Sequence, residues 1–72
     1  MDLLEIEDER RLTREEAAAW LQDLAHQLAR NNQLQLRQEG LKYTVRVPAE
    51  VTMEVEVEIG DDGSKLEIEL HW

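Results

Sequence analysis

The chain has 72 residues and carries 17 acidic against 8 basic side chains, for a formal net charge of −9. A chain of this length is expected to form a single domain, residues 1–72, with a modest core, because it buries only about 60% of the surface that it exposes when unfolded. The acidic balance excludes a nucleic-acid binder and disfavours anionic membranes, since both of those partners attract clusters of lysine and arginine.

Cysteine content and hydropathy bear on the compartment. The chain contains no cysteine, which rules out disulfides and thiolate metal sites. It also lacks a run of about 18 apolar residues, and its N-terminal sequence is acidic, unlike a secretory signal peptide. We therefore expect a cytoplasmic protein.

The first predicted elements are a short strand and a helix. Weak alternation of apolar and acidic residues indicates a possible strand over about residues 3–7. A helix over about residues 13–30 follows, because Thr13 and Glu16 have the spacing of a capping box. Asn31-Asn32 ends it, since asparagine tolerates the left-handed conformation. The apolar positions of this helix recur at spacings of three and four and lie on one face: Ala17, Trp20, Leu21, Leu24, Ala25 and Leu28.

Four strands are predicted after the helix, because apolar and polar residues alternate in each segment. They cover about residues 33–37, 41–47, 51–59 and 65–72. Glycine-bearing turns at 37–40 and 60–63 indicate hairpins, and Pro48 suits the turn between the two middle strands. The economical fold is an α+β two-layer sandwich, with the helix packed on one face of an antiparallel meander sheet and residues 3–7 as a possible fifth strand.

The last two strands form the most regular part of the chain, and their alternation separates two faces. Together with the helix, their apolar face is expected to supply the structural core, namely Trp20, Leu24, Leu28, Val55, Val57, Ile68, Leu70 and Trp72. The opposite face is the expected interaction surface, namely Glu54, Glu56, Glu58, Glu67, Glu69 and His71.

The register of the same hairpin predicts an electrostatic conflict. With residues 60–63 as the loop, Glu58 lies opposite Lys65, but Glu56 lies opposite Glu67 and Glu54 opposite Glu69. Like charges directly opposite one another destabilise a sheet. We therefore expect the stability of the domain to rise with added salt, which screens such charges.

Several segments in this order resemble a known family. They are T-R-E-E-A-A-A-W-L-Q-D-L-A in the helix, V-P-A-E-V before the third predicted strand, and L-E-I-E-L-H-W at the end. Over essentially its whole length the chain resembles the amphi-Trp domain family of small prokaryotic proteins. The resemblance implies no catalytic role, so no site residues carry over from it. Trp72 matches the tryptophan position of the family, which implies a structural role at least as readily as a functional one.

The residues that could perform chemistry have simpler structural explanations. Paired glutamates act as general acids and bases when they line a cleft, whereas these lie on an open sheet face. His71 with its neighbouring carboxylates would hold a divalent ion only weakly, and we expect no metal or cofactor. No phosphate-binding loop or nucleophile motif is present. We therefore expect a protein that is not an enzyme.

Two functions from different classes remain open. The favoured one is a protein-interaction module that presents its acidic sheet face or an edge strand to a basic protein or to a second copy of itself. The alternative is a stand-alone structural or stress-related protein, whose acidic surface serves solubility in salt without a dedicated ligand.

Overall fold

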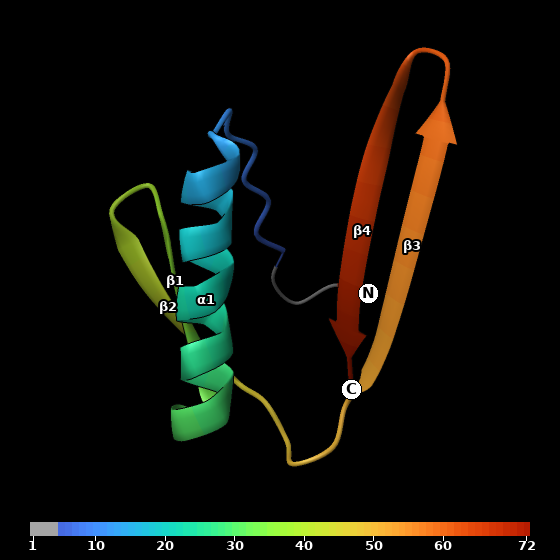
Figure 1. The fold of residues 1–72 in the computed structure, drawn as a ribbon. Helices are drawn as coiled ribbons and strands as arrows, with labels where there is room; N and C mark the ends of the chain where they lie inside the picture. The colour runs from blue at the N-terminus through green and yellow to red at the C-terminus, as the bar shows by residue number, and fades with distance from the viewer. Residues whose placement is uncertain (1–4) are drawn as a thin grey trace.

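One helix and four strands make up the described part of the chain. The computed structural model describes residues 5–72, apart from the side chains of Asn31 and Gln38. Helix α1 (Arg14–Asn31) is followed by β1 (Gln33–Gln38), β2 (Leu41–Arg46), β3 (Thr52–Gly60) and β4 (Gly63–His71). Strand β1 pairs antiparallel with β2, and β3 pairs antiparallel with β4 (Figure 1). The predicted α+β class, the helix and the four strands are confirmed.

Helix α1 begins and ends where its local sequence indicates. The Thr13 hydroxyl accepts a hydrogen bond from the Glu16 amide at 3.1 Å, and the Glu16 carboxylate accepts one from the Thr13 amide at 3.1 Å. The backbone hydrogen bond of Thr13, followed by that of its hydroxyl, lowers the pKa of Glu16. Asn32 closes the helix in the left-handed region, at φ 54°. The predicted capping box and helix stop are therefore confirmed.

The turn between β1 and β2 is tighter than the sequence suggested. Gln38 pairs with Leu41, so the loop consists of Glu39 and Gly40 alone. Both residues have positive φ, 54° and 79° respectively, as the type I′ turn of a two-residue hairpin requires. Strand β1 therefore extends one residue beyond its predicted end.

The β3–β4 hairpin, called the ribbon below, has the predicted register. Ile59 pairs with Ser64, and each following pair steps outward as expected. The pairing also includes Gly60 with Gly63, so the predicted four-residue loop is reduced to Asp61 and Asp62. This register depends only on the position of the turn and on strict alternation, both of which are local features of the sequence. It separates an acidic face of the ribbon from an apolar one.

The four strands do not join into a single sheet, which corrects the predicted meander. The structure has two separate two-stranded sheets, β1–β2 and β3–β4, and the pairing of the two middle strands that a meander requires is absent. The Val47 amide instead donates to the Asn32 carbonyl at 2.9 Å and extends the β1–β2 ladder. Pro48 follows, and a residue before proline favours the extended conformation. The chain therefore continues past β2 instead of turning back along it (Figure 1).

The predicted N-terminal strand is not formed in its described part. Residues 5–7 are not in a strand, and residues 3 and 4 lie outside the described residues. The outer edge of β1 is not free to pair, because its Gln35 amide donates to the side-chain oxygen of Gln27 at 2.7 Å. The N-terminal segment runs over α1 instead, where Ile6 and Leu12 line a groove.

The predicted core is not assembled within the described part of a single chain. Val47 alone is buried there, at 8% exposure, and Trp20, Val57 and Trp72 are 44%, 63% and 56% exposed. Helix α1 packs against β1, whereas no Cα atom of β3 or β4 lies within 8 Å of one in α1. The residues predicted as core occupy the expected faces, but the ribbon stands beside α1 and not on it (Figure 1). Among the described residues, no helix combines the length and apolar character needed to cross a membrane.

Candidate functional site

The ribbon presents a continuous charged surface, called the acidic face below. Its members alternate with the apolar residues of β3 and β4 and are all exposed. They are Glu54, Glu56, Glu58, Lys65, Glu67, Glu69 and His71. Because successive side chains of a strand point to opposite sides, the pairing of β3 with β4 places all of them on one side of the ribbon. The structure thus brings every predicted interaction residue onto one surface.

The two ends of the acidic face differ in charge compensation. Near the turn, the Lys65 ammonium lies 3.0 Å from a Glu67 oxygen and 3.4 Å from a Glu58 oxygen. The hydrogen bond to Glu67, followed by that to Glu58, raises the pKa of Lys65. At the far end, Glu54 lies directly opposite Glu69, and within residues 5–72 neither forms an ion pair with lysine or arginine. Repulsion is therefore concentrated at the end of the ribbon remote from its turn.

Three possible metal ligands meet at that uncompensated end. Glu54, Glu69 and His71 each offer a ligand atom, and these atoms lie within 4.8 Å of one another. Two carboxylates and an imidazole are a donor set that divalent transition metals accept. All three side chains are exposed, and strong sites usually orient their ligands through further hydrogen bonds. Among the described residues, no hydrogen bond orients any of the three.

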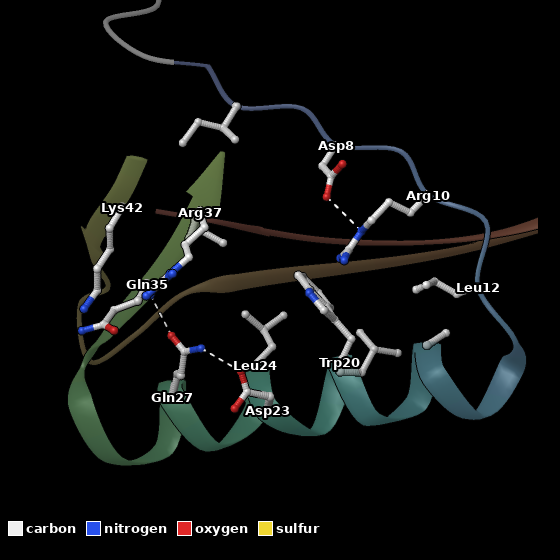
Figure 2. Close-up of a pocket in the computed structure, with 14 residues that line it drawn as sticks. Asp8, Arg10, Leu12, Trp20, Asp23, Leu24, Gln27, Gln35, Arg37 and Lys42 are labelled. Atoms are coloured by element: carbon white, nitrogen blue, oxygen red, sulfur yellow. Dashed lines mark hydrogen bonds and ion pairs between the residues drawn. The ribbon is translucent and has the colours of Figure 1, made fainter. Parts of the chain in front are cut away.

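A groove lies between α1, the N-terminal segment and β1 (Figure 2). It has a volume of about 770 Å³. Trp20, Leu21 and Leu24 of the helix give it apolar walls, and both basic and acidic side chains also line it. Figure 2 shows the side chains of Arg10 and Trp20 pointing toward one another across it, with Arg10 held by Asp8 at 3.0 Å. We call this hollow the helix groove.

The match to a family model covers nearly the entire chain. The model of the Amphi-Trp domain matches residues 2–72. The chain belongs to the Amphi-Trp domain family. No curated protein and no solved structure matches it.

Trp72, which matches the tryptophan position of the Amphi-Trp family, lies at the end of the ribbon. Trp72 directly follows β4, and continuation of the strand alternation assigns it to the apolar face, opposite the glutamates. Its neighbours on that face include Leu70, which is half-buried, and Ile68, which is exposed. In this Amphi-Trp domain the amphipathic strand is therefore a two-sided element, with carboxylates on one side and an exposed apolar surface ending in tryptophan on the other.

Sequence reasoning missed the polar link that holds α1 against β1. Gln27 accepts from the Gln35 amide at 2.7 Å and donates to an Asp23 carboxylate oxygen at 3.1 Å. The spacing of Asp23 and Gln27 by four residues could have indicated the second hydrogen bond, since such pairs face each other on a helix. The bond to β1 had no sequence signal, because it depends on how the helix is docked.

Proposed function

We propose that this Amphi-Trp domain is a non-enzymatic protein-interaction module whose acidic face binds a basic protein. The observation that supports this most is the Glu54–Glu69 pair, which lies directly opposite across the ribbon without a lysine or arginine partner in the described residues. Arginine or lysine side chains of a partner would replace this repulsion with charge-assisted hydrogen bonds. The partner's positive charges would thus compensate the glutamates at one end of the acidic face, as Lys65 does at the other end.

The backbone of the ribbon offers a second element of recognition. Within the described residues, β3 and β4 pair only with each other, so each has one edge whose amides and carbonyls are open to an added strand. An extended basic segment could join either edge while its cations reach the acidic face. Main-chain hydrogen bonds would then provide affinity, and the glutamates would select for positive charge.

The same charge distribution limits the other partners. Nucleic acids and anionic membrane surfaces are disfavoured, because a net charge of −9 repels both. We place the domain in the cytoplasm, on the strength of its cysteine-free composition.

The test compares two variants of equal charge. The face variant carries glutamine at four positions of the acidic face: Glu54, Glu56, Glu67 and Glu69. The control variant neutralises four exposed acids elsewhere: Glu9, Glu39, Glu50 and Asp61. Affinity capture from cytoplasmic extract is then performed with both variants and the wild type, at low and high salt. Capture of one basic protein by the wild type and control, lost in the face variant and at high salt, supports the module.

Two results would contradict the module. Equal loss of capture in both variants would mean that only total charge matters. The absence of any enriched partner would favour the alternative, a stand-alone structural or stress-related protein whose acidic surface maintains solubility in salt. That alternative also predicts that the face variant aggregates at lower salt concentrations than the wild type.

A further inference from the structure

Two apolar surfaces of the chain lack a partner within the described residues. One is the apolar face of the ribbon, where Ile59 is 82% exposed and Val55 is 59% exposed. The other is the helix groove, where Leu21 is 46% exposed. A two-stranded hairpin is marginally stable in water unless a helix or a further strand covers its apolar face. The ribbon therefore requires a cover, and the helix groove requires an occupant.

The exposed area shows how much surface remains to be buried. The accessible surface of the chain is 7063 Å², whereas a folded monomer of 8.4 kDa is expected to expose about 4600 Å². The radius of gyration is 14.1 Å, against about 11 Å expected for a compact domain of this length. Roughly 2400 Å² per chain is thus exposed in excess. Two chains together would bury close to 4800 Å², which lies in the range of obligate homodimers.

We propose that two copies of this chain form a twofold dimer, in which the apolar ribbon face of each copy packs into the helix groove of the other. Each chain contains one uncovered ribbon and one unoccupied groove, so a reciprocal exchange satisfies all four surfaces at once. Twofold symmetry also closes the assembly, which leaves no apolar surface to recruit further copies.

The dimensions and charges of the two surfaces agree with this exchange. The helix residues that line the groove run from Ala17 to Gln27 and span about 16 Å, so the groove can receive the central part of β3, whose nine residues span about 30 Å. The charged side chains that line the groove are three basic ones, Arg10, Arg37 and Lys42, and two acidic ones, Asp8 and Asp23, so the groove does not repel the acidic ribbon. The acidic faces of both copies stay in solvent, and their carboxylates are not desolvated.

A second copy is a better occupant than the chain's own ribbon. The Val47 amide is bound to the Asn32 carbonyl, and the following segment leads β3 away from β2. In this arrangement the ribbon and α1 of one chain have no Cα atoms within 8 Å of each other. Both surfaces are thus open to another molecule at the same time.

The first measurement is the mass of the intact chain in solution. Light scattering at tens of micromolar should give about 16.8 kDa, twice the chain mass of 8.4 kDa. A monomer, or any assembly larger than a dimer, would overturn the proposal. Because the acidic face plays no part in this interface, the four-glutamine face variant should give the same mass as the wild type. Loss of partner capture in that variant with retention of the dimer separates the two proposals.

The second measurement identifies the surfaces in contact, and the absence of natural cysteine makes it direct. Chains carrying Val55→Cys and differently tagged chains carrying Leu24→Cys are mixed, equilibrated and treated with a short thiol cross-linker. Both positions lie near the middle of their elements, so the result does not depend on the direction of packing. A covalent heterodimer is expected.

Two controls make the cross-link decisive. Glu56→Cys lies next to Val55 in sequence but on the acidic face, and with Leu24→Cys it should cross-link at least tenfold less. A single chain carrying both Val55→Cys and Leu24→Cys should give covalent dimers. Cross-linking within one chain would show that the ribbon closes on its own helix. That result, or equal reaction of Glu56→Cys, would overturn the exchange.

Discussion

The Glu54–Glu69 pair allows the electrostatics of the acidic face to be measured with one substitution. Glu54→Gln removes a charge while keeping the size of the side chain. Oxygen atoms of the two carboxylates lie within 4.8 Å of each other, and two unit charges at that separation repel by about 0.9 kcal/mol in water. We therefore expect the substitution to increase the free energy of unfolding by about 0.9 kcal/mol at low ionic strength.

The salt concentration is the second variable in this experiment. With a Debye length of about 10 Å at 0.1 M and about 3 Å at 1 M, the repulsion falls to about 0.5 and about 0.2 kcal/mol respectively. In a domain of this size these values correspond to an increase in Tm of about 4–7 °C at low salt and about 1 °C at 1 M. Thermal unfolding followed by circular dichroism at several sodium chloride concentrations measures the trend.

A substitution on the same face provides the control with opposite sign. Glu58 lies opposite Lys65, with 3.4 Å between the charged atoms, so Glu58→Gln should lower Tm where Glu54→Gln raises it. Both effects should shrink as salt is added. If Glu54→Gln does not raise Tm at low salt, or if its effect is independent of salt, the glutamates do not repel as described.

Three further predictions concern the helix and its hairpin. Hydrogen bonding to Thr13 lowers the pKa of Glu16, so the stabilisation from the Glu16 carboxylate is present above the ordinary carboxyl pKa and is lost as pH falls through the lowered pKa. The Tm difference between wild type and Glu16→Gln should therefore vanish in acid. A difference that does not change with pH would contradict this. Gly40→Ala should cost about 1 kcal/mol in urea unfolding, because φ is +79° and no atom lies near the added Cβ. Gly60→Ala, at a position without positive φ, should cost less, and equal losses would refute the backbone explanation. Gln27→Ala should cost about 1 kcal/mol and accelerate hydrogen exchange of the β1 amide that it binds at 2.7 Å; unchanged exchange would mean that this bond does not persist in solution.

The features that were predictable from sequence depend on interactions between close neighbours in the chain. The capping box needs only Thr13 and Glu16, three positions apart, and the register of the ribbon needs only its turn and strict alternation. The acidic face follows directly from that register. All three features can therefore be predicted from the sequence without knowledge of the tertiary arrangement.

The features that were not predictable depend on how the helix and the two hairpins pack together, which the local sequence does not determine. Alternation showed which side of the ribbon is apolar, but not what covers it, and the meander was inferred because one sheet is the simplest way to bury that side. Pro48 was interpreted as a turn, whereas the extended conformation that it favours at Val47 leads β3 away from β2. The turn at Glu39-Gly40 was also predicted wrongly. A four-residue turn was expected at 37–40, whereas Gln38 pairs with Leu41 and leaves a two-residue type I′ turn.

The purely local pairing of the fold has a consequence for the order in which the protein folds. Every contact between elements joins neighbours in sequence: α1 with β1, β1 with β2, and β3 with β4. Such structures have low contact order, and isolated hairpins form within about 1–10 μs. Meeting a second chain is slower and depends on collision. Refolding of a dimer built in this way should thus show a fast phase independent of protein concentration, followed by a phase whose rate rises as the protein becomes more concentrated.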